Sequence, residues 1–134
     1  METHPTCASG VLLCDPVTLA TARQQADALD QVVPHLKAKG VHELLIMRSD
    51  PQPCAISVYG TREDLWHQPE MTIQADGGWL VATVTVGERS GSFLVELPRV
   101  GPDNEPIGTR TELVPSTLPS RVALLVAEHA RVAA

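Results

Sequence analysis

The cysteines and histidines are the residues of this chain best suited to metal binding or nucleophilic chemistry. Cys7 and Cys14 are too far apart in sequence for a structural zinc knuckle, and Cys54 has no cysteine close to it. The histidines show neither a pair at helical spacing nor an HExxH arrangement; they are His4, His35, His42, His67 and His129. We therefore expect buried thiols, surface histidines and no metal site. A site formed by Cys7, Cys14 and one distant histidine stays an alternative.

Nucleophilic and phosphate-binding motifs are also missing. Cys14 precedes a helix, where a thiol gains reactivity, but no pattern places a base beside it. The chain has no GxSxG elbow and no SxxK. The glycines of the 76–79 segment lack the spacing of a phosphate-binding loop and lie between strands. We expect no catalytic residue and no cofactor, and the balance favours a protein that is not an enzyme.

One segment, Thr61–Glu70, concentrates residues suited to recognition. It contains Arg62, Glu63, Asp64, Trp66, His67 and Glu70. Glu63, Asp64 and His67 have side chains of the types used in acid–base catalysis. We favour a polar crossover with one helical turn, in which Leu65 and Trp66 plug the end of the core. Contact with a partner or ligand through Arg62, Trp66 and His67 is the alternative.

The first positioning element is a helix that begins at Asp15–Pro16, a capping side chain followed by a proline at the first helical position. Its apolar face is Leu19, Ala22, Ala26, Leu29, Val33 and Leu36. Its polar face is Arg23, Gln24, Gln25, Asp27, Asp30 and Gln31. Pro34 predicts a kink or a break near Val32–Val33, and Gly40 predicts the end.

Strand patterns follow the helix. Val41–Met47 is apolar on both faces, which indicates a central strand, and we expect it to form a hairpin with Ala55–Tyr59 around an Asp50–Pro53 turn. Met71–Leu97 predicts a three-stranded meander. Its two-residue Gly77–Gly78 loop sets one register, with Met71 opposite Val84, Thr72 opposite Thr83, Ile73 opposite Ala82, Gln74 opposite Val81 and Ala75 opposite Leu80.

This register assigns the meander's side chains to two faces. The residues expected to point toward the helices are Ile73, Ala75, Leu80, Val84, Phe93 and Val95. The face turned away from the helices, here called the open face, is rich in threonine and carries an apolar island of Trp79, Val81 and Leu94. Tryptophan is enriched at the centres of protein interfaces, so the island is a candidate binding surface. A solvated open face is the plainer interpretation.

The rest of the chain completes an α+β fold. Pro98–Gly108 is predicted to be an exposed loop, and Thr109–Val114 an edge strand. Ser116 or Thr117 then caps a final helix that buries Leu118, Val122, Leu125 and Val126. We expect one domain over residues 1–134, with residues 1–9 as a flexible arm. Its architecture is an antiparallel sheet of about five strands with an N-terminal and a C-terminal helix packed on one face.

Composition excludes several classes of partner. The net charge is −6, and the basic residues are spread along the chain, so we expect no nucleic-acid binding. No apolar stretch is long enough to cross a membrane, and the N-terminus lacks the pattern of a secretory signal. Three cysteines suit a reduced, cytoplasmic chain, and the preference for Arg, Ala, Val and Pro suggests a GC-rich bacterial source.

Three functional hypotheses remain open. The first is a regulatory or protein-binding module that uses the open face or the 61–70 segment. A homodimer formed through one of these surfaces is included in this hypothesis. The second is a small-molecule binder or small enzyme with a pocket near Trp66 and His67. The third, a special case of the first, is an inhibitor of the immunity or antitoxin type.

Overall fold

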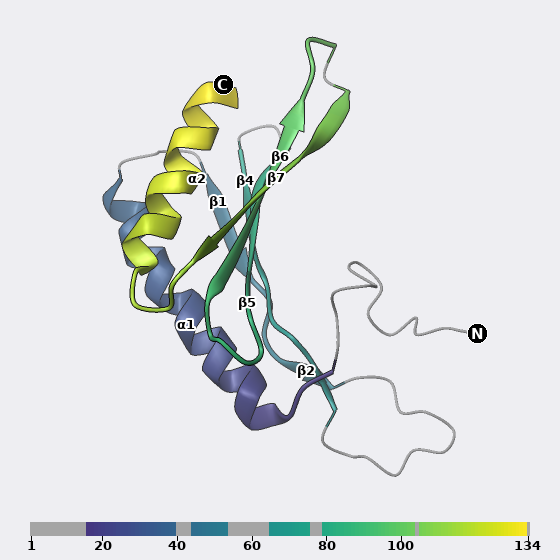
Figure 1. Cartoon of the computed structure of the whole chain (residues 1–134), viewed down its shortest axis with the longest axis vertical. Helices are drawn as coiled ribbons and strands as arrows, with labels where there is room; N and C mark the ends of the chain where they lie inside the picture. Colours follow the sequence, from purple (N-terminus) through teal and green to yellow (C-terminus); the bar gives the residue numbers. More distant parts are fainter. Residues whose placement is uncertain (1–15, 40–43, 54–64, 76–78, 104, 134) are drawn as a thin grey trace, which may run out of the picture.

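The structure is a computed structural model that describes residues 16–39, 44–53, 65–75, 79–103 and 105–133. In these ranges the elements, in chain order, are α1 (Leu19–Ala38), β1 (Leu45–Arg48), β2 (Gln52–Pro53), β3 (Trp66–His67), β4 (Met71–Gln74), β5 (Leu80–Val86), β6 (Phe93–Val100), β7 (Pro106–Val114) and α2 (Pro119–Ala133). Five strands form an antiparallel sheet in the order β1-β4-β5-β6-β7. Both helices lie against one face of it (Figure 1). The predicted α+β fold is confirmed.

Helix α1 begins three residues later than the proline pattern indicates. Thr18 is the N-cap, and its side chain accepts a hydrogen bond from the Thr21 backbone N–H at 3.2 Å. Val17, just before the cap, is held in extended backbone by two hydrogen bonds with Trp66, and this pairing delays the helix. Of the kink or break expected near Val32–Val33, the break is wrong, because α1 runs through Pro34 to Ala38.

The buried face of α1 differs from the predicted face at Leu19, which is half-buried, and at Gln25, Val32 and Val33. Val32 is buried and Val33 half-buried, which is a small rotation of the stripe. Gln25, assigned to the polar face, is 3% exposed. Its amide Nε2 donates to the Val86 backbone carbonyl at 3.0 Å and to the Gln68 Oε1 at 2.9 Å. These acceptors at the end of the sheet explain why a polar side chain is buried here.

The meander is present, but its register changes once. Met71↔Val84, Thr72↔Thr83 and Ile73↔Ala82 pair as predicted. The next pair is Gln74↔Leu80, so a β-bulge leaves Val81 without a partner in β4, and the predicted pairs Gln74–Val81 and Ala75–Leu80 are wrong. One extra residue reverses the faces of everything before it in the strand.

β1 and its surroundings differ from the expected hairpin. Among the described strands, β1 pairs with β4 and lies at an edge of the sheet, not in its centre. The segment expected to pair with it, 55–59, lies outside the described residues. β2 pairs with β3 and extends the β1–β4 ladder past a hydrogen bond from the Ser49 N–H to the Glu70 carbonyl. Pro51 and Pro69, which lack N–H donors, flank this junction and interrupt the ladder.

β6 and β7 form a long hairpin where a loop was expected. Pro98 to Gly108 is mostly strand: β6 reaches Val100, and β7 begins at Pro106. Pro98 fits because it lies beyond the last β5–β6 pair, Thr83↔Glu96, where a ladder donor is not required. Its carbonyl accepts a hydrogen bond from His129 Nε2 of α2 at 2.7 Å.

The core lies between the sheet and the helices. Its largest fully buried side chains include Phe93, Leu29, Met71, Ile73 and Leu97. Helix α2 contributes Val122, Ala123, Leu125, Val126, Ala127 and Ala130. Leu118, predicted to be buried, precedes α2 and is exposed. No helix in the described part of the chain is long and apolar enough to cross a membrane.

Candidate functional site

The open face can be read directly from the strand pairs. Neighbouring strands align Leu45, Gln74 and Leu80 in one row across β1, β4 and β5. A second row crosses all five strands: Met47, Thr72, Thr83, Glu96 and Thr111. A third contains Thr85, Leu94 and Leu113. Because side chains alternate along a strand, these rows point away from the residues that pack under α1 and α2.

Apolar side chains on this face are unusually exposed at one corner. Leu45 is 54% exposed, Met47 44% and Leu80 37%. They lie on β1 and β5, in adjacent rows on either side of β4. We call this group the β1–β5 corner. Neither α1 nor α2 lies over the open face (Figure 1). A cluster of this kind on a folded chain is typical of an interaction surface.

A second apolar pair lies at the opposite side of the face. Leu113 on the edge strand β7 is 72% exposed and pairs with half-buried Leu94. Threonines separate this pair from the β1–β5 corner. Within the five strands, Glu96 is the one charged side chain that the registers place on the open face. The face therefore offers two apolar groups around a single carboxylate.

The predicted island of Trp79, Val81 and Leu94 is only partly correct. Leu94 lies on the open face, as its register predicts. The placement of the other two is wrong: Val81 is fully buried, and Trp79 packs half-buried on the core. The β-bulge is the cause, since it turns Val81 inward and exchanges the faces of Trp79 and Leu80.

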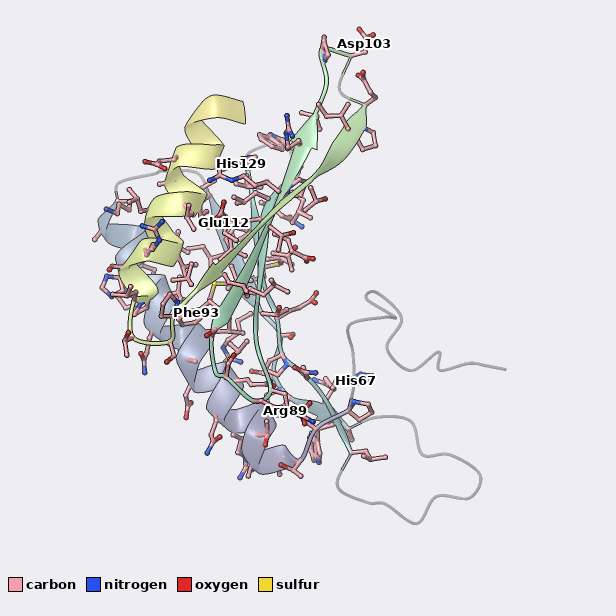
Figure 2. The ribbon with its side chains drawn as sticks, viewed as in Figure 1. His67, Arg89, Phe93, Asp103, Glu112 and His129 are labelled. Carbon is pink, nitrogen blue, oxygen red and sulfur yellow. The ribbon has the colours of Figure 1, made fainter. Side chains whose placement is uncertain are left out.

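The structure places Trp66 and His67 in strand β3, not in a helical turn. The Trp66 N–H donates to the Val17 carbonyl at 2.8 Å, and its carbonyl accepts from the Val17 N–H at 3.0 Å. Both side chains are half-buried. Figure 2 shows His67 near the end of the molecule opposite Asp103 and the β6–β7 hairpin tip. Arg62 lies outside the described residues. Both interpretations of the Thr61–Glu70 segment stay predictions: Leu65 and Trp66 as a plug at the end of the core, and contact with a partner or ligand.

The most exposed residues of the site are not among those that the sequence pattern predicts. The apolar run Leu44–Met47 predicts a strand covered on both sides, but one of its two apolar faces is exposed. The run itself is visible in the sequence, whereas the strands that lie beside it are not. The unbroken register places Leu80 in the core, and the bulge turns it to the open face. Leu113 follows three polar residues in an edge strand and carries no comparable signal.

The described residues contain no group of three or more His, Cys, Asp or Glu side chains that could hold a metal ion. Cys7, Cys14 and Cys54, and the carboxylates Glu63 and Asp64, lie outside the described residues. The expectations about them stay predictions.

No family model matches the sequence, and no curated protein or solved structure matches it either. The assignment of function therefore depends on the geometry of the site.

Proposed function

We propose that this chain is a protein-binding module that holds an apolar, basic segment of another protein across its open face. The observation that carries the proposal is the β1–β5 corner, where Leu45, Met47 and Leu80 remain exposed on a face that neither helix covers. Fully burying a side chain of this kind contributes roughly 1.5–3 kcal/mol. A partner that covers the corner gains from several such contacts.

Charge selects the chemistry of the partner. The chain carries a net charge of −6, and Glu96 lies on the row that crosses the open face between the two apolar groups. A segment with apolar side chains and a lysine or arginine opposite Glu96 complements this pattern. Electrostatic attraction speeds its association and disfavours acidic partners such as nucleic acids. A regulatory role in a bacterial cytoplasm, supported by the composition, is part of the same proposal.

Site-specific photocrosslinking in cells tests the proposal. A photoreactive amino acid replaces Met47 on the open face or Leu124 on α2, which is 38% exposed and serves as a control on the other side of the molecule. We expect a discrete adduct with a second protein at position 47 and none at position 124. Equal labelling at both positions, or an adduct with this chain alone, would contradict the proposal.

The partner identified in this way then allows a matched affinity measurement. Leu80 and Leu124 are 37% and 38% exposed, so Leu80→Asp and Leu124→Asp introduce the same charge at equally accessible sites. We expect Leu80→Asp to weaken binding by about tenfold or more and Leu124→Asp to leave it unchanged. Equal effects of the two variants would show that the open face is not the binding surface.

A further inference from the structure

The free edge of β7 is long enough to pair with another strand. β7 ends the sheet, and no described strand pairs with its outer edge. Residues 106–111 and Leu113 are exposed. An uncovered edge presents unpaired N–H and C=O groups, which is the condition under which a second chain can extend a sheet.

The regular part of this edge has defined limits. A bulge between the pairs Arg99↔Gly108 and Val100↔Pro106 distorts β7 at one end, where Gly108 has a φ of 131°. At the other end, Pro115 follows Val114 and has no N–H to donate. Residues 108–114 therefore form the regular edge, and Thr111 is its central residue.

Two copies of an edge can pair antiparallel only in certain registers. Every second residue of β7 directs its N–H and C=O groups outward. In a paired edge, each of these residues must lie opposite a residue of the second copy whose groups also point outward. The two-fold axis then passes through a residue position. An axis at Thr111 uses the whole 108–114 segment. An axis at Arg110 would oppose two arginines, and an axis at Glu112 would oppose two glutamates; like charges directly opposite are destabilising.

The Thr111-centred register gives charge complementarity. It places Arg110 opposite Glu112 of the second copy, and Glu112 opposite Arg110 of the second copy. Within one chain the Arg110 Nε already donates to the Glu112 Oε2 at 2.7 Å, so both side chains lie on the same side of β7. Glu112 pairs with buried Val95, which puts this side under the helices. Figure 2 shows Glu112 on the side of the sheet that faces α2.

We propose that two copies of this chain form a homodimer by pairing their β7 strands antiparallel about Thr111. The sheet then runs through both copies, and the two open faces lie on the same side because the two-fold axis is perpendicular to the sheet. Leu113 faces Thr109 of the second copy, which adds an apolar contact on the open face. The dimer is separate from partner binding at the β1–β5 corner and does not require it.

Charge reversal with mixing tests the register. Arg110→Glu opposes two carboxylates across the axis, and Glu112→Arg opposes two guanidinium groups. We expect each variant alone to dimerise about tenfold or more weakly than the unchanged chain, as measured by sedimentation velocity. An equimolar mixture of the two variants places opposite charges together and should restore the dimer. The ion pair within each chain is lost in both variants, so it cannot account for restoration.

Cysteine crosslinking locates the axis. In a chain whose three native cysteines are replaced by serine, Thr111→Cys brings two equivalent positions directly opposite, at Cα separations of about 4.5–5.5 Å, within disulfide range. Thr109→Cys is the control, because position 109 lies about 13 Å along the strand from its own equivalent. We expect oxidation to link copies through position 111 and not through position 109.

The outcomes separate this proposal from the proposed function. A chain that is monomeric over a micromolar series, or a dimer that survives both charge reversals, would overturn β7 pairing without affecting the photocrosslink at position 47. A dimer accompanied by no adduct at position 47 would overturn the partner proposal alone. Leu80→Asp should leave the dimer intact, since Leu80 lies on β5, away from the paired edge.

Discussion

Gln25 and Val86 are joined by a hydrogen bond in the interior, although 61 residues separate them in sequence. The Gln25 amide Nε2 donates to the Val86 carbonyl oxygen at 3.0 Å and links the N-terminal half of α1 to the end of β5. The same nitrogen donates to Gln68, next to β3. The Gln25 Oε1 is buried and has no hydrogen-bond partner within the described part of the chain. One side chain thus ties the helix to β3 and to the end of β5.

We predict that removing the Gln25 amide destabilises the fold. Gln25→Leu leaves the Val86 carbonyl buried without this donor, and should lower the free energy of unfolding by about 1–3 kcal/mol in urea denaturation. Gln25→Glu places a carboxylate against two acceptor oxygens, and burial raises the pKa of that introduced carboxyl above its unfolded value. Its stability should therefore fall as pH rises from acidic to neutral.

Gln24, which is exposed, provides the control for the two Gln25 variants. Gln24→Leu and Gln24→Glu make the same substitutions in a glutamine at the neighbouring position. Both should remain within about 0.5 kcal/mol of the unchanged protein. A Gln25→Leu variant as stable as Gln24→Leu would show that the hydrogen bonds of Gln25 contribute nothing net.

Most of the architecture could be predicted because the apolar pattern is unambiguous where only one face is buried. Leu29 and Leu36 follow helical spacing, and the buried Phe93, Val95 and Leu97 recur at every second position of β6. The pattern fails where apolar residues are consecutive. The run Trp79-Leu80-Val81-Ala82 is apolar at every position, so an apolar residue faces the core in either register. The sequence pattern therefore does not reveal the bulge.

The candidate site was harder to predict for a related reason. Within the described residues, Leu45 and Met47 are exposed because β1 lies at an edge of the sheet, on a face that neither helix covers, and strand order depends on pairing between distant segments. Local patterns contain no information about which strand lies at the edge. The charge pair Arg110–Glu112 has a short sequence spacing, but its use across a two-fold axis follows only from the free edge of β7.

Pro34 supplies a prediction of increased stability. It lies inside α1, where it cannot donate to the carbonyl four residues before it, and its side chain is exposed. Pro34→Ala should raise the free energy of unfolding by about 1–2 kcal/mol, because the helical gain of about 3 kcal/mol is partly offset by a more flexible unfolded chain. Gln31→Ala, on the same helix, is the control. No gain from Pro34→Ala relative to Gln31→Ala would contradict the prediction.

His129 should anchor α2 to β6 through its hydrogen bond to the Pro98 carbonyl. Figure 2 shows His129 pointing from α2 toward the strands. His129→Leu should lower the free energy of unfolding by about 1 kcal/mol in thermal or urea denaturation. His129→Gln retains an N–H donor near the same position and should recover part of this loss. Equal stability of the two variants would indicate that packing, not the hydrogen bond, holds this contact.

The β-bulge makes the sharpest prediction, because it exchanges the roles of two adjacent residues. Val81 is fully buried and Leu80 is on the open face, whereas the unbroken register would place them the other way round. Val81→Asp should lower the free energy of unfolding by about 4 kcal/mol or more, since it buries an unpaired charge. Leu80→Asp should change it by less than about 1 kcal/mol. Urea denaturation monitored by circular dichroism measures both changes in the free energy of unfolding. A larger decrease for Leu80→Asp than for Val81→Asp would favour the unbroken register, which places Trp79 on the open face.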